Sequence, residues 1–113
     1  MTQPAYILIC GRDAELLETR GLVLRSAGFH VSTTVGPIAM SPGLGTVDLL
    51  IVCHTLSAQE RQADLSALAE SSSAAKSLCL SPSRGPDESC GATLDSFAGP
   101  RAMLARVAEL LGA

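Results

Sequence analysis

Short apolar runs alternate along this chain with longer stretches whose apolar residues recur at helical spacing. Ala5–Cys10 and Val47–Cys53 are almost continuously apolar, and Lys76–Leu80 is a shorter segment of the same kind. Such runs are typical of strands that are covered on both faces in a parallel sheet. Phe29–Thr34 alternates and is rich in β-branched residues, which predicts a half-covered or edge strand, and Ala92–Phe97 predicts a short last strand.

Capping signals mark the helices between these strands. Asp13 is a candidate N-cap for a helix over residues 13–28, which ends at a glycine. Ser57 and Glu60 form the capping-box pattern S-x-x-E at the start of a second helix. A third helix begins at Pro100, because proline is tolerated at the first helical position. The apolar residues of its predicted inner face are Leu104, Val107 and Leu111, with Met103 and Leu110 beside them.

Two connecting segments are dominated by proline, glycine and serine. Segment 35–46 has room for at most about two helical turns, because its prolines exclude a longer helix. Segment 81–91 shows turn chemistry throughout and no helical period. Strands that alternate with helices predict the α/β class and a single domain over residues 1–113. The natural architecture at this size is a flavodoxin-like three-layer sandwich. Its five parallel strands would have the order 2-1-3-4-5, with helix 2 short and helix 4 short or missing.

Composition and charge narrow the range of partners and sites that we expect for this chain. The chain has 113 residues, a formal net charge of −3 and no cluster of lysine or arginine, which argues against nucleic acid or an anionic membrane as partner. We find no apolar run that could span a bilayer and no signal-peptide pattern, and therefore expect a cytoplasmic protein. The four cysteines form no CxxC pair and the histidines lack zinc-ligand spacing, so we expect no zinc site. Three of them, Cys10, Cys53 and Cys79, lie at or near the ends of apolar runs, which is typical of reduced, buried thiols.

Three segments of the chain form a combined pattern: ILICGRDAELLETRGLVLRSAGFHV, DLLIVCHTLS and GPRAMLARVAELL. Together they resemble the receiver domains of bacterial response regulators. The first is similar to the receiver's first strand and helix, the second to the family pattern DLVLLDxxMP, and the third to the closing helix. The resemblance covers the whole chain and implies the CheY-like fold.

The resemblance also implies where a phosphorylation site would lie. Receivers hold Mg²⁺ with two acidic residues after strand 1 and the phosphoacceptor Asp after strand 3, because Mg²⁺ requires oxygen ligands. On that pattern Gly11 and Arg12 occupy the acidic pair, with Asp13 beside them, and Cys53 occupies the acceptor position. Ser81 takes the hydroxyl position after strand 4, and Ser96 takes the lysine position after strand 5. Only Ser81 keeps the family chemistry.

We therefore predict a degenerate pseudo-receiver that is not an enzyme, takes no cofactor and needs no Mg²⁺. It would act as a protein-interaction module in bacterial signal transduction, with a signalling protein or a second copy of itself as partner. One alternative is a thiol-based redox sensor that uses Cys53 or Cys10 as a reactive thiol. Another is a small-anion site at Arg12 and Ser81, against which stands the simpler hypothesis that Arg12 pairs with a local carboxylate.

Overall fold

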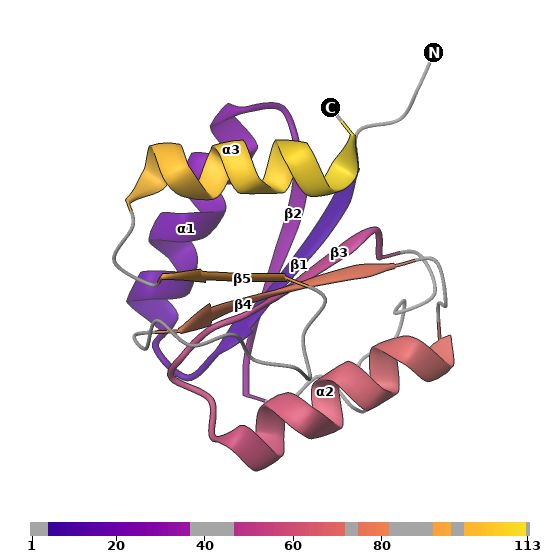
Figure 1. Cartoon of the computed structure of the whole chain (residues 1–113). Helices are drawn as coiled ribbons and strands as arrows, with labels where there is room; N and C mark the ends of the chain where they lie inside the picture. The colour runs from indigo at the N-terminus through magenta and orange to yellow at the C-terminus, as the bar shows by residue number, and fades with distance from the viewer. Residues whose placement is uncertain (1–4, 37–46, 72–74, 82–91, 96–98, 113) are drawn as a thin grey trace.

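The computed structural model describes residues 5–36, 47–71, 75–81, 92–95 and 99–112, which are coloured in Figure 1. Strands and helices follow one another in these ranges as the alternating pattern predicts. The strands are β1 (Tyr6–Gly11), β2 (His30–Val35), β3 (Leu49–Val52), β4 (Lys76–Ser81) and β5 (Ala92–Asp95). The helices are α1 (Ala14–Ser26), α2 (Ala58–Ser71) and α3 (Pro100–Leu111).

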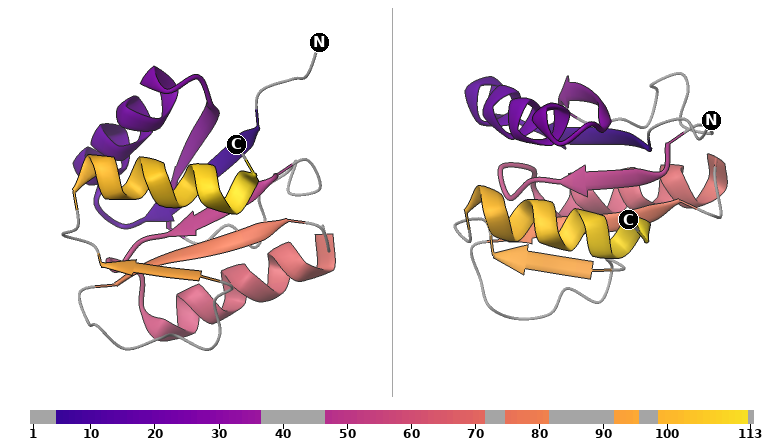
Figure 2. Two further views of the ribbon diagram at one scale, coloured as in Figure 1. Left: turned by 45° about the horizontal axis from the view of Figure 1, so that its top comes forward. Right: turned by 90° about the horizontal axis from the view of Figure 1, so that it is seen from above.

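The five strands form one parallel sheet in the order β2-β1-β3-β4-β5, which confirms the predicted order. Helices α1 and α3 cover one face of the sheet and α2 covers the other (Figures 1 and 2). This arrangement is the flavodoxin-like three-layer sandwich. The predictions of a short second helix and a short or missing fourth helix fall on residues 37–46 and 82–91, outside the described ranges.

The core lies in two apolar layers, one on each face of the sheet. In β1, Ile7 and Ile9 pack in the layer beneath α1 and α3, whereas Leu8 and Cys10 pack in the layer against α2. Successive side chains of a strand point to opposite faces. Both faces of β1 are covered, so nearly every residue of the strand is apolar, and the same holds for β3.

Helix α1 ends in a Schellman motif. The amide of Gly28 donates to the carbonyl of Arg25 at 3.0 Å, and the amide of Phe29 donates to the carbonyl of Leu24 at 3.3 Å. Gly28 has a φ of 97°, a backbone conformation that favours glycine. The helix therefore ends at Ser26, two residues earlier than predicted. Ala27 is its C-cap, and Gly28 is the residue that follows the cap.

The remaining elements match the prediction with small shifts. β3 is shorter than the predicted strand 47–53, so that Cys53 lies directly after its end. The buried side of α3 is centred on Met103 and Val107. Leu104, which we placed on that face, is partly buried and packs at its margin. No helix of the described residues is long and apolar enough to cross a membrane.

Candidate functional site

The carboxyl ends of β1 and β3 meet at one edge of the sheet, because neighbouring parallel strands end on the same side. Gly11 ends β1, Arg12 and Asp13 lead into α1, and Cys53 follows β3. The amide of Cys53 donates to the carbonyl of Cys10 at 2.9 Å, which joins the two strand ends. We call this edge the rim.

Gly11 is tightly enclosed at the rim. A Cβ atom added to it would lie 2.8 Å from Thr55 Oγ1, 3.0 Å from Cys53 Cβ and 3.3 Å from Leu17 Cδ2. The first two separations are closer than van der Waals contact allows. The close approach of the β3–α2 loop, and not an unusual backbone angle, therefore requires glycine here.

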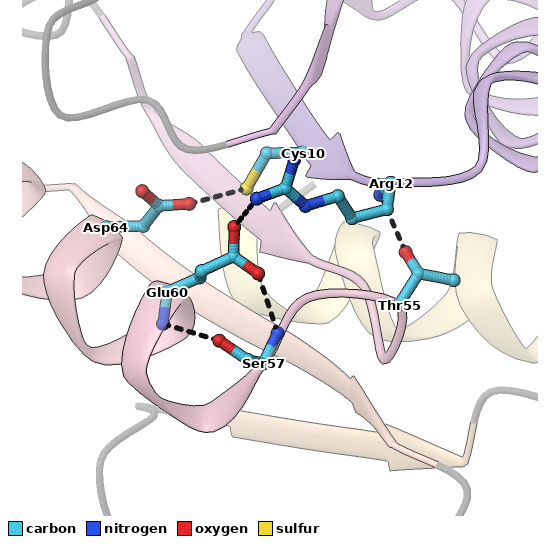
Figure 3. A network of polar contacts seen from close by, with 6 residues as sticks. All are labelled: Cys10, Arg12, Thr55, Ser57, Glu60 and Asp64. Carbon is cyan, nitrogen blue, oxygen red and sulfur yellow. Dashed lines mark hydrogen bonds and ion pairs between the residues drawn. The ribbon is translucent and has the colours of Figure 1, made fainter.

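Arg12 links β1 to the start of α2. Its guanidinium forms an ion pair with the carboxylate of Glu60, and its amide donates to Thr55 Oγ1 at 2.8 Å (Figure 3). Arg12 thus pairs with a carboxylate that is close in space but distant in the sequence, and its sequence neighbour Asp13 is not the partner. Glu60 is 48 residues away in the sequence, so the local pattern gave no indication of this pair.

Glu60 also completes the predicted capping box. Its Oε1 accepts from the Ser57 amide at 3.1 Å, and its own amide donates to Ser57 Oγ at 3.1 Å (Figure 3). The Ser57 amide first, and Arg12 next, hold the pKa of the Glu60 carboxyl below its ordinary value. The carboxylate of Glu60 therefore caps α2 and also pairs with the guanidinium of Arg12 at the end of β1.

Asp13 serves as the N-cap of α1, as the sequence predicts. Its Oδ1 accepts from the amide of Leu16 at 3.2 Å, and its backbone is extended, as N-caps require. The carboxylate of Asp13 thus stabilises the start of α1.

Cys53 is buried on the face covered by α1. Its Sγ accepts a hydrogen bond from Arg20 Nη1 at 3.1 Å, and Arg20 is itself only 9% exposed. Burial raises the pKa of the Cys53 thiol, and the nearby guanidinium of Arg20 opposes this without reversing it. Sequence reasoning missed Arg20, although it lies three residues after Leu17 and four before Leu24, on the buried side of α1.

Cys10 faces the opposite layer and contacts a buried carboxylate. Its thiol donates to Asp64 Oδ2 at 3.2 Å, and neither residue is accessible to solvent (Figure 3). Burial first, and then Asp64, raises the pKa of the Cys10 thiol. Asp64 was also missed, although its spacing of four residues from Leu68 places it on the inner side of α2. The raised pKa values argue against a reactive thiolate at either cysteine.

The other predicted site residues are only partly described. Ser81 ends β4 and pairs with Asp95 in the register of β5, while its side chain and all of Ser96 lie outside the described part of the chain.

Cys10 and Cys53 are free thiols, but Cys79 is disulfide-bonded, which corrects our expectation of a reduced thiol there. An apolar run predicts that a cysteine is buried but does not show which cysteines meet in the fold. Within the described ranges, no group of three or more His, Cys, Asp or Glu side chains could hold a metal ion.

Comparison with solved structures identifies the fold of the chain. No protein-family model and no curated protein matches the chain. Among solved structures, a putative pilus assembly-related protein from Burkholderia pseudomallei is similar with a TM-score of 0.80 and 21% identity, over 99% of this chain and 93% of that one. A putative pilus assembly protein, CpaE, from Burkholderia thailandensis gives 0.80 and 20%, over 96% and 99%. The chemotaxis protein CheY4 from Vibrio cholerae gives 0.81 and 15%, over the same shares. The chain therefore has the CheY-like receiver fold.

Proposed function

We propose that this chain is a receiver-like protein-interaction module that works without phosphorylation. The observation that carries the proposal is the ion pair between Arg12 and Glu60. In the receiver pattern Arg12 occupies the place of a metal-binding carboxylate. A guanidinium at that place pairs with the start of α2 and occupies the position with a positive charge, where a receiver would place a metal ligand.

The residues at the rim do not fit Mg²⁺. Gly11 brings no side-chain donor, Arg12 brings a positive charge, and the carboxylate of Asp13 caps α1. Mg²⁺ requires hard oxygen ligands in near-octahedral geometry. At the acceptor position, the thiol of Cys53 cannot form the acyl phosphate that an aspartate forms, and it is buried against Arg20.

A receiver-like domain that takes up no phosphoryl group would carry its signal through contacts with other proteins, so this proposal assigns the chain an interaction role. The partner would be a signalling protein or a second copy of the chain. Two of the similar structures are described as pilus assembly proteins, so the assembly machinery of pili is the first setting in which to look for the partner. The partner would recognise one constitutive state, because no phosphoryl group would switch the domain.

Acetyl phosphate with Mg²⁺ tests the proposal directly. We expect no gain in intact mass, and no shift in the amide NMR spectrum beyond that caused by salt, whereas a receiver with its carboxylates intact responds in both measurements. The oligomeric state, measured by light scattering, should also be the same with and without the reagent. A Mg²⁺-dependent gain of one phosphoryl group by the native chain would overturn the proposal.

A variant that restores two carboxylates of the receiver pattern provides a matched control. The variant Arg12→Asp with Cys53→Asp returns two of the three carboxylates that the receiver pattern requires. We expect it to bind Mg²⁺, seen as shifts of rim amides, more strongly than either single variant. If the native chain bound Mg²⁺ as well as the double variant does, the loss of the carboxylates would not explain its chemistry.

A further inference from the structure

The outer face of α1 carries an exposed leucine between two charges of opposite sign. Glu18, Leu22 and Arg25 follow one another at spacings of four and three residues, which places them on one side of the helix. Leu22 is 57% exposed, which sets it apart from Leu17 and Leu24 on the buried side of the same helix. Glu18 and Arg25 are exposed as well, and α1 lies at the surface of the molecule (Figure 2).

Neither of these two charges is matched by an opposite charge within the described ranges. The guanidinium of Arg25 donates to the backbone carbonyl of Val31 at 3.0 Å, and that acceptor is neutral. The ion pairs among the described residues join Arg12 to Glu60 and Arg106 to Glu109. The carboxylate of Glu18 and the guanidinium of Arg25 can therefore each pair with a charge on another molecule.

The order of the three residues is complementary to itself when two helices run antiparallel. In a two-fold symmetric contact, a residue i faces j of the other copy, and j faces i. With the two-fold axis next to Leu22, Glu18 of each copy faces Arg25 of the other, and the two leucines meet between them. The seven residues from Glu18 to Arg25 span about 10 Å of helix, which leaves room for the leucine pair between the two ion pairs. A parallel contact would place like charges opposite each other.

We propose that the outer face of α1 binds a second copy of this chain, with Leu22 against Leu22 and Glu18 against Arg25 on both sides. The inference deepens the proposed function and rests on it for the choice of a second copy as the partner. A contact between two helix faces is smaller than a standard protein–protein interface, so the dimer is transient, with a dissociation constant on the order of 1 mM. Salt weakens it, because the paired charges are exposed to solvent.

Concentration dependence tests whether the contact forms. Sedimentation equilibrium of the native chain, without a phosphate donor, should show a monomer and a dimer in exchange. In a dilution series followed by NMR, the amides around Leu22 should shift. Leu22→Asp places a charge at the centre of the contact and should leave only the monomer. A native chain that stays monomeric at millimolar concentration, or a dimer that Leu22→Asp does not weaken, would overturn the proposal.

Exchange of the two charges tests the antiparallel arrangement. Glu18→Arg alone and Arg25→Glu alone each bring like charges together and should weaken the dimer about tenfold or more. The double variant restores opposite charges and should bind within about threefold of the native chain. Arg25→Glu also removes the bond to the Val31 carbonyl, but the double variant lacks that bond too, so recovery would come from the charges. A double variant as weak as the single variants would contradict the antiparallel contact.

Glu70 provides the matched control for the charge change. It is exposed on α2, which covers the opposite face of the sheet, so Glu70→Arg should leave the dissociation constant unchanged. The result also separates this inference from the proposed function. A chain that dimerises through α1 but takes up a phosphoryl group from acetyl phosphate would overturn only the proposed function. A chain that takes up none and stays monomeric would overturn only the α1 contact.

Discussion

The same substitution, glycine to alanine, should have opposite effects at two positions. At Gly11 the added Cβ would lie 2.8 Å from Thr55 Oγ1 and 3.0 Å from Cys53 Cβ. Cys53 Cβ is fixed by the backbone at the end of β3, so only a shift of the strand end relieves the contact. Overpacking of this kind costs about 1–3 kcal/mol of stability.

Gly21 provides the matched control within α1. A Cβ there would lie 3.4 Å from Thr33 Cγ2, an ordinary van der Waals contact. Gly21 is in the interior of a helix, where alanine is favoured over glycine by about 0.5–1 kcal/mol. Gly21→Ala should therefore stabilise the protein and Gly11→Ala should destabilise it.

Urea unfolding followed by far-ultraviolet circular dichroism measures both effects. With a typical dependence of the free energy of unfolding on urea, the midpoint for Gly11→Ala should fall by about 1 M, and that for Gly21→Ala should rise by about half as much. The slope of the transition should not change, because the same surface is exposed on unfolding. Midpoints that move in the same direction, or an unchanged midpoint for Gly11→Ala, would refute the argument from close packing at the rim.

Two further predictions concern ionisable groups. Burial raises the pKa of Cys10 and of Cys53, so the folded protein should react with iodoacetamide at about pH 8 far more slowly than a free thiol, and at the ordinary rate in urea. Rapid labelling of folded Cys53 would support the thiol-sensor alternative instead. The pKa of Glu60 lies below its ordinary value of 4.5 in the folded state, so its stabilisation is present above that pH and is lost as the pH falls through the folded pKa. Glu60→Gln should therefore make the urea midpoint less dependent on pH below about pH 5, and an unchanged dependence would show that Glu60 does not contribute.

Much of the fold could be predicted because the signals are local. The continuous apolar run of β1 reflects two covered faces, and the order of elements selects one sheet topology. Ser57 and Glu60 are three residues apart, so their capping box can be recognised in the sequence alone. The ends of the helices and strands were harder to predict. The end of α1, for example, depends on which carbonyls accept from the amides of Gly28 and Phe29.

The candidate site was predictable as a set of positions but not as a set of contacts. The resemblance to receivers placed Gly11, Arg12 and Cys53 near one another, and the structure brings them to one edge of the sheet. The resemblance did not indicate which side chains would form hydrogen bonds to residues at the strand ends, namely Glu60, Arg20 and Asp64. Each of these is a charged residue on a helix, at least 33 positions away in the sequence from the residue that it contacts.

The sequence by itself determined the alternation of strands and helices, the caps at Asp13 and Ser57, and the glycine and arginine that follow one another where β1 ends. Only the tertiary structure decided which partners the polar side chains near the strand ends contact. Arg12 pairs with Glu60 across 48 positions, Cys53 with Arg20 across 33, and Cys10 with Asp64 across 54. Secondary structure depends on neighbours within a few residues, whereas buried polar groups find partners wherever the packing of the sheet and helices places them.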